Sequence, residues 1–296
     1  MKRQHPFSRR SIATIAASLL FLAACGDGSE SQNSSSAGDC DVRIVSLSPT
    51  ATEMLYGIDA GDCVVAVDSL STYPADVADK VTDISAYEPS AEVILAYEPT
   101  HVLISYDPGI VDQLTAADPD IVIWTGDAAS SLDGVYAQIT ELGEATGRTA
   151  EAEELIASMK ERIAKATDGV TAPAGTSIFY ELDDTLYSVT SNTFVGSLME
   201  PFGVTNIADG VEDGNDYPQL NAEAIIAANP TVIFLADTKC CGQTAETVSA
   251  RPGWSEIAAV QNGNIVELDD DIASRWGPRV VDLVEQFAAA VKALNS

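Results

Sequence analysis

The chain has 296 residues, of which 46% are hydrophobic, and its formal net charge is −30 at pH 7. This length allows two modest domains or one large one, and the apolar content excludes a mostly disordered chain. The acidity favours solubility and argues against nucleic acid or an anionic membrane surface as a partner, because both need a basic protein face.

The N-terminus predicts export and lipidation. Basic residues precede a short apolar run, which is typical of a signal peptide over residues 1–24. The segment Leu22-Ala23-Ala24-Cys25 resembles the lipobox of bacterial lipoproteins, which implies that Cys25 is lipidated; an ordinary signal with a chance cysteine is the alternative. Residues 25–41 are then a flexible tether, rich in Ser and Gly. We therefore expect a body held on the extracytoplasmic face of the cell membrane, in contact with the membrane only through the lipid.

Four other cysteines would lie in an oxidising compartment. Cys40 and Cys63 each precede an apolar run, and if these runs are neighbouring parallel strands, a Cys40–Cys63 disulfide is geometrically reasonable. Cys240 and Cys241 are adjacent and could bond to each other, stay free or pair elsewhere. The chain shows no metal-binding spacing, and after signal removal its one histidine is His101, inside a predicted strand. We expect the protein itself to hold no metal and no cofactor.

From residue 42 to residue 148, Val/Ile-rich runs alternate with helical patterns. Runs of this kind predict parallel strands covered on both faces, in an N-terminal α/β lobe. The predicted strands are 43–49, 63–68, 100–105 and 121–126, and the predicted helices are 50–58, 91–99 and 110–118.

A long amphipathic segment follows at residues 149–168. Its apolar residues recur at helical period, its glutamates crowd the first turn and its basic residues come late, which suits the helix dipole. A helix of this length spans roughly 30 Å. We therefore expect residues 149–170 to be a rigid helix that links two lobes.

The alternation resumes in residues 171–296, which predicts a C-terminal α/β lobe. Its predicted strands are 176–182, 185–190, 231–236 and 263–268, and its predicted helices are 193–203, 222–230 and 278–294. The predicted fold class is therefore α/β, with two similar lobes that have mainly parallel sheets and are joined by one long helix.

One ten-residue pattern occurs in both lobes. AEVILAYEPT at residues 91–100 matches AEAIIAANPT at residues 222–231, and Glu92 matches Glu223. Two copies of one unit indicate two lobes related by a pseudo-two-fold axis. A carboxylate near a helix start is worth about 0.3–1 kcal/mol, which is sufficient to explain both glutamates. Alternatively, the pair binds a two-fold symmetric partner that carries basic residues.

Several segments together resemble a known family. They are RIVSLSPTATEMLYGI, STYPADV, the two helices that end in Pro-Thr, RPGWSEIAAVQNGNIVEL and ASRWGPRVVDLVEQF. They resemble the class III substrate-binding proteins of ABC importers for ferric siderophores, haem and cobalamin, over residues 43–294. The resemblance implies a monomer that captures a metal-chelate ligand between two lobes and delivers it to an ABC permease dimer. It also implies that Glu92 and Glu223 dock onto arginines of that permease.

Aromatic and basic residues at strand ends and in the following loops are the candidate ligand contacts. They are Tyr73, Tyr87, Tyr106, Tyr187, Tyr217, Lys239, Arg275 and Trp276. Alternatively, each tyrosine is a half-buried packing residue, and Arg275 forms an ion pair at the start of a helix. The family resemblance places Tyr73, Tyr87, Tyr106 and Tyr217 where relatives carry aromatic cleft residues. The few basic residues disfavour an anionic catecholate siderophore and favour a hydroxamate siderophore or a corrinoid.

Two other classes of function compete with ligand delivery. The acidic clusters Asp183-Asp184 and Asp269-Asp270-Asp271 are compatible with a carboxylate-based hydrolase, but the chain shows no catalytic serine motif, phosphate loop or histidine base. We therefore expect no enzyme activity. A ligand-sensing surface lipoprotein without a transport role would have the same sequence features.

Overall fold

The computed structural model describes residues 40–295, so the predicted signal peptide, the lipidation site Cys25 and most of the tether lie outside the described residues. The first sheet has the order β2-β1-β3-β4, and all of its strands are parallel. Its strands are β1 (Ile44–Leu47), β2 (Val64–Val67), β3 (His101–Ile104) and β4 (Val122–Thr125). Every residue of β1 is buried, because β1 is a central strand with helices over both faces; a continuous apolar run is typical of such a strand.

The helices of the first lobe include one that the sequence interpretation missed. They are α1 (Pro49–Gly57), α2 (Ala91–Leu95), α3 (Val111–Ala117) and α4 (Leu132–Thr146), with 3-10 turns at Gly61–Cys63 and Ala75–Lys80. We predicted no helix over α4. Its buried residues Val135, Ile139 and Leu142 have helical spacing, and Ser131 caps its start by accepting the Gly134 N–H.

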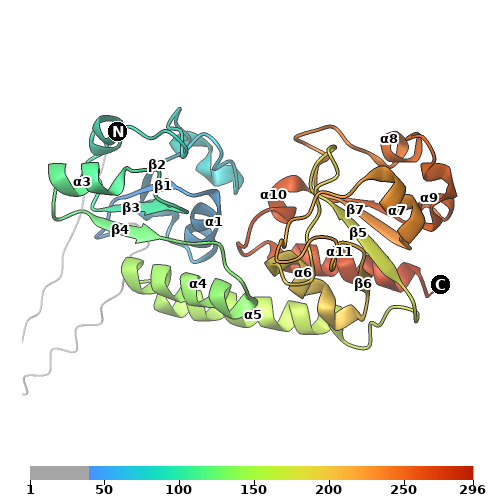
Figure 1. Cartoon of the computed structure of the whole chain (residues 1–296). Helices are drawn as coiled ribbons and strands as arrows, with labels where there is room; N and C mark the ends of the chain where they lie inside the picture. Colours follow the sequence, from blue (N-terminus) through green and yellow to red (C-terminus); the bar gives the residue numbers. More distant parts are fainter. Residues whose placement is uncertain (1–39, 296) are drawn as a thin grey trace, which may run out of the picture. The chain divides into compact units, whose positions relative to one another are not determined.

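The second sheet repeats the plan of the first, with the order β6-β5-β7-β8 and parallel pairing throughout. Its strands are β5 (Ser177–Glu181), β6 (Thr205–Asn206), β7 (Val232–Leu235) and β8 (Ile265–Glu267). In each lobe the first strand in the chain is flanked by the second and the third, with the fourth at the edge (Figure 1). The predicted α/β class with two similar lobes is confirmed.

One predicted strand of the second lobe was wrong. Residues 185–190 form only an isolated bridge between Tyr187 and Gln219, and the short β6 takes the edge position. The helices of this lobe are α6 (Phe194–Met199), α7 (Ala222–Ala228), α8 (Ala245–Ser249), α9 (Ala258–Gln261), α10 (Asp270–Ala273) and α11 (Val280–Ala293), with 3-10 turns at Glu200–Phe202 and Trp254–Glu256.

The long helix α5 (Thr149–Thr167) packs against α4 of the first lobe and against α11 of the second (Figure 1). Its buried residues Ala152, Met159 and Ala166 belong to a core cluster that contains residues of both sheets, such as Ile44 and Phe234. Two smaller clusters lie separately, one in each lobe. Because the largest cluster runs through both lobes along α5, the lobes share one packed interior. No helix among the described residues is long and apolar enough to cross a membrane.

The repeated Pro-Thr has the same structural role in both lobes. The Thr100 N–H donates to the Arg43 carbonyl at 2.9 Å, and the Arg43 N–H donates to the Thr100 hydroxyl oxygen at 2.9 Å. The equivalent bonds between Thr231 and Ser177 measure 2.8 Å and 3.2 Å. In each lobe this threonine therefore joins the chain after the repeated helix to the start of the lobe's first strand. The sequence match thus reflects matching backbone geometry.

Candidate ligand site

The loops after the strands of the first lobe are joined by a buried network of hydroxyl groups. The Thr52 hydroxyl donates to Ser46 Oγ at 2.9 Å and lies 3.1 Å from Ser71 Oγ. The Ser105 hydroxyl donates to Ser48 Oγ at 2.7 Å. These groups follow or end β1, β2 and β3, so the carboxyl edge of this sheet is held in a preformed shape.

A buried carboxylate joins the two lobes through an inter-lobe clasp, formed by Glu53, Arg275 and Arg279. Glu53 belongs to α1, and its side chain is only 2% exposed. Arg275 Nη1 lies 3.0 Å from Glu53 Oε1, and Arg279 Nε donates to Glu53 Oε2 at 2.9 Å. Arg275 also pairs with Asp271 at 2.7 Å. Two guanidinium groups satisfy the buried charge, as a carboxylate removed from water requires.

A pocket of about 390 Å³ lies beside Arg275. Tyr217, Arg275 and Trp276 line it, so the structure brings together three of the predicted ligand residues. Apolar groups of the second lobe, including Leu182 and Phe194, and residues 128–130 of the first lobe complete the lining. The Trp276 indole N–H donates to Gln138 Oε1 of α4 at 3.0 Å, which fixes the ring at the pocket wall.

Tyr73 lies at a second pocket, of about 260 Å³, which Glu53 and Arg279 of the clasp also line. The Arg279 guanidinium carbon lies 4.0 Å from the centre of the Tyr73 ring, a cation–π contact. A larger hollow of about 520 Å³ lies within the second lobe between α6 and β6, and no predicted ligand residue lines it.

The remaining predicted tyrosines are exposed but lie elsewhere. Tyr87 and Tyr106 approach each other on the first lobe, with ring centres 6.2 Å apart, and neither lines the two pockets beside the clasp. Tyr187 pairs with Gln219 in the isolated bridge. All five predicted tyrosines are between 41% and 65% exposed, so each presents ring surface to solvent.

Lys239 is held by carboxylates of its own lobe. Its ammonium group lies 2.6 Å from Asp269 and 2.9 Å from Asp271. The Asp269 and Asp271 side chains raise the pKa of Lys239, so it stays charged. The cationic charge predicted for ligand contact is thus already paired, as it is at Arg275. Among residues 40–295, no group of three or more His, Cys, Asp or Glu side chains could hold a metal ion.

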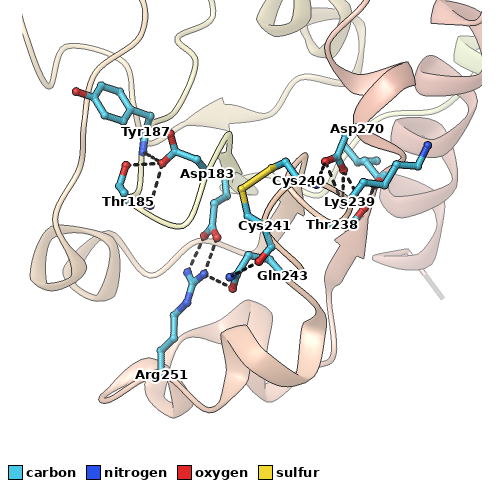
Figure 2. Close-up of a disulfide and its surroundings, with 12 residues drawn as sticks. Asp183, Thr185, Tyr187, Thr238, Lys239, Cys240, Cys241, Gln243, Arg251 and Asp270 are labelled. Atoms are coloured by element: carbon cyan, nitrogen blue, oxygen red, sulfur yellow. Dashed lines mark hydrogen bonds and ion pairs between the residues drawn. A yellow bond between two sulfur atoms is a disulfide. The ribbon is translucent and has the colours of Figure 1, made fainter. Parts of the chain in front are cut away.

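A buried acid pair lies at the carboxyl ends of β5 and β7. Glu181 and Asp237 are both fully buried, and Arg251 binds Glu181 through two hydrogen bonds, of 2.7 Å and 2.6 Å. Figure 2 shows Arg251 beside Gln243, whose side-chain oxygen is a further partner at 2.8 Å. Burial raises the pKa of Asp237 to about 7, and the neighbouring Glu181 charge adds to the effect.

Both cysteine pairs are bonded in the structure. Cys40 and Cys63 are linked across the start of the β1–β2 pair, with Cα atoms 5.1 Å apart. Cys240 and Cys241 are bonded to each other in the loop after β7 (Figure 2). The Cys40–Cys63 bond lies at one edge of the sheet, as predicted. For Cys240 and Cys241 the sequence allowed a mutual bond, free thiols or other partners, and the structure has the mutual bond.

Similarity to known proteins over most of the chain shows the family. The family model of a periplasmic binding protein matches residues 44–272. This chain belongs to the periplasmic binding protein family. It is 32% identical to the "Uncharacterized ABC transporter substrate-binding lipoprotein YvrC" of Bacillus subtilis, over 84% of this chain and 79% of that protein. It is 30% identical to a "Cobalamin-binding protein" of Halobacterium salinarum, over 84% of this chain and 69% of that protein.

Solved structures of other periplasmic binding proteins have the same two-lobed fold. The heme-binding protein RhuT of Roseiflexus sp. RS-1 superposes with a TM-score of 0.73 at 26% identity, covering 86% of this chain and 99% of that one. The family is one of binding proteins, so the two pockets beside the clasp are the first places to seek a ligand.

The glutamates of the repeated motif occupy matching positions in this periplasmic binding protein. Glu92 lies in the first turn of α2, which Ser90 caps, and Glu223 lies in the first turn of α7, which Asn221 caps. Both glutamates are exposed, and within residues 40–295 neither side chain has a hydrogen-bond or ion-pair partner.

Sequence reasoning missed Glu53 and the Glu181–Asp237 pair. Glu53 stands in an apolar helical run, and Glu181 and Asp237 each stand at or just after the end of a buried strand. A charge inside an apolar pattern is the signal that could have singled them out, because a buried charge needs a partner. The identity of that partner is not visible in the pattern.

Proposed function

We propose that this chain is the extracytoplasmic substrate-binding component of an ABC importer, and that its ligand is a corrinoid of the cobalamin type. Two relatives support the proposal by name: the Bacillus protein as an ABC transporter substrate-binding lipoprotein, and the Halobacterium protein as a cobalamin-binding protein. On this proposal the chain works as a monomer, has no enzyme activity, and receives any metal inside its ligand.

The chemistry of the pocket at Trp276 carries the choice of ligand. Its one cation among the lining residues is Arg275, and the charges of Glu53 and Asp271 already neutralise that cation. Tyr217 and Trp276 offer flat faces to a large ring. A corrinoid presents mainly amides at its ring edge, whereas haem and catecholate siderophores present anionic groups that need free arginines or lysines. The pocket therefore suits a largely uncharged ringed ligand.

Isothermal titration calorimetry against cobalamin, haem, a ferric hydroxamate and a ferric catecholate tests the ligand class. We expect cobalamin to bind most tightly, with the ferric hydroxamate second because it also lacks strong negative charge. Tightest binding of haem or of the catecholate would overturn the corrinoid assignment. No detectable binding of any of the four ligands would overturn the importer proposal as well.

A pair of tryptophan variants tests the site. Trp276→Ala should weaken cobalamin binding by about tenfold or more, because it removes an aromatic anchor worth at least about 1.4 kcal/mol. The matched control is Trp254→Phe, because Trp254 is buried in the core of the second lobe and lines neither pocket beside the clasp. Equal effects of the two changes would place the ligand elsewhere.

We also propose that Glu92 and Glu223 contact basic residues of a permease dimer. Their exposure, their matching positions and their lack of partners support this role. Exposed charges of this kind guide orientation and docking more than they add affinity.

Ligand uptake by cells that carry Glu92→Ala with Glu223→Ala tests the docking role. Uptake should fall to background while calorimetric affinity for the ligand stays unchanged. The control is Asp112→Ala with Glu246→Ala, because these are also exposed first-turn acids, one in each lobe. Normal uptake by the first double variant would remove the docking role. Normal uptake by cells that lack this protein altogether would favour the sensing alternative.

The membrane anchor is a further part of this proposal. Cys25→Ser should release the protein from the membrane fraction into the extracytoplasmic fluid, because the lipid is its only membrane contact. A variant that stays membrane-bound would contradict lipidation at Cys25.

A further inference from the structure

The Cys240–Cys241 bond differs from the Cys40–Cys63 bond in its surroundings. Cys240 and Cys241 are both exposed, in the loop between β7 and α8. Cys63 is 1% exposed and belongs to the largest core cluster, and Cys40 packs against that cluster. A thiol reagent from solution therefore reaches the adjacent pair more readily than the first bond.

Chain stabilisation does not explain the adjacent pair. A disulfide stabilises a fold mainly by closing a loop of the unfolded chain, and its effect grows with the length of that loop. The Cys40–Cys63 bond spans 23 positions, whereas the Cys240–Cys241 bond spans one and closes no chain segment. Exposed disulfides are also the ones that reductants open most easily.

The loop that carries the pair is fastened at both ends by hydrogen bonds. Asp270 accepts the Lys239 N–H at 3.0 Å and the Cys240 N–H at 2.8 Å. The Asp237 carbonyl accepts the Cys241 N–H and the Gln243 N–H, each at 3.3 Å. Figure 2 shows the bonded pair and the contacts of Asp270 with this loop. We therefore expect the loop conformation that the disulfide fixes to keep these amides within reach of Asp237 and Asp270.

The same loop reaches the buried acid pair. The Gln243 side-chain oxygen accepts an N–H of Arg251 at 2.8 Å, and Arg251 in turn binds the fully buried Glu181. A change in the loop would therefore reach the carboxyl edge of the second sheet.

We propose that the Cys240–Cys241 bond is a redox-exchange site, opened by a dithiol reductant, and that its opening releases the loop from Thr238 to Gln243. A thiolate of the reductant attacks one sulfur, the Cys–Cys bond breaks, and a mixed disulfide forms. The second thiolate of the reductant then attacks that mixed disulfide. The reductant leaves as a disulfide, and the protein gains two electrons and two protons as two thiols.

The local charge selects among reductants. Asp269, Asp270 and Asp271 lie around the loop and contact Lys239, in a chain of net charge −30. An anionic thiol such as glutathione is repelled, so at low salt it should react more slowly than neutral dithiothreitol or cationic cysteamine. Added salt should narrow that difference.

Graded reduction of the whole oxidised protein tests the site. Aliquots are treated with increasing dithiothreitol, alkylated with iodoacetamide and digested, and each cysteine peptide is followed by mass spectrometry. We expect Cys240 and Cys241 to be alkylated at dithiothreitol concentrations about tenfold or more below those that open Cys40–Cys63, a difference of about 30 mV or more. Simultaneous opening of the two bonds, or earlier opening of Cys40–Cys63, would overturn the proposal.

Hydrogen exchange tests the release of the loop. Reduction should speed exchange at the amides of residues 239, 240, 241 and 243 by about tenfold or more, because the released loop no longer holds these amides against Asp237 and Asp270. The variant Cys240→Ser with Cys241→Ser should show the fast rates without reductant and no further response to it. The variant Cys40→Ser with Cys63→Ser keeps the adjacent bond and should still respond. Unchanged exchange in the reduced protein would refute the release.

Discussion

Replacing Asp237 with asparagine should remove a pH dependence from the stability of this protein. Asp237 is fully buried next to Glu181, and its side-chain oxygens have no hydrogen-bond donor among the described residues. Burial and the Glu181 charge raise its pKa from the ordinary value of 3.8 to about 7. The folded protein therefore keeps a proton on Asp237 at pH values where the unfolded chain has lost it.

The sign of the effect follows from this difference. Below pH 3.8 both states hold the proton, and the free energy of unfolding has its full value with respect to Asp237. As the pH rises to about 7, only the unfolded chain gains from ionisation, so stability falls. At about 1.4 kcal/mol for each pH unit, the whole loss is about 4 kcal/mol, of which about 2 kcal/mol falls between pH 5 and pH 7.

Urea unfolding at pH 5, 6, 7 and 8 measures this loss. Asp237→Asn keeps the shape of a protonated carboxyl group and does not ionise, so its stability should exceed that of the parent by about 2 kcal/mol more at pH 7 than at pH 5. Burial lowers the pKa of His101, which gives the opposite trend in both proteins and cancels in their difference. The control is Asp184→Asn, because Asp184 is an exposed acid of the same lobe. This change should alter the free energy of unfolding by less than about 0.5 kcal/mol at every pH. Parallel curves for the parent and Asp237→Asn would refute the reasoning.

Three other substitutions separate buried from exposed polar contacts. Glu53→Ala leaves the two arginines of the clasp without their shared carboxylate and should lower the urea unfolding free energy by about 3–5 kcal/mol; a loss under about 1 kcal/mol would contradict the buried inter-lobe contact. Thr231→Val removes the oxygen that accepts the Ser177 N–H and should cost about 1 kcal/mol in thermal unfolding, so an unchanged melting temperature would show that this bond adds nothing. Arg162→Ala breaks two half-exposed ion pairs to α11 and should cost less than about 1 kcal/mol, and a larger loss would mean that these pairs hold α5 in place.

The sequence predicted the parts of the fold whose pattern is local. The buried run of β1 and the helical spacing of α5 appear in the structure close to their predicted bounds. The segment at residues 185–190 also alternates, but Asp183 accepts the N–H groups of Thr185 and Tyr187 and turns the chain there, so no strand forms. Residues of β6 were missed because a strand of two residues carries no period.

The candidate ligand residues show which features of the site cannot be predicted from local sequence pattern. Tyr217, Arg275 and Trp276 were grouped as candidates, and one pocket contains all three. Nothing in the segment around Arg275 indicates that its charge is matched by Glu53, 222 positions earlier in the chain. Partners so distant in sequence are set by how the two lobes pack, which single-residue patterns do not encode.

The clasp also constrains the order in which this polypeptide can fold. Glu53 belongs to the first helix of the first lobe, yet its two cationic partners follow it by 222 and 226 positions in the chain. Until those residues pack against α1, the Glu53 carboxylate has neither of its cationic partners. The first lobe therefore reaches its full stability only after the arginines of the second lobe have been synthesised and have packed against it.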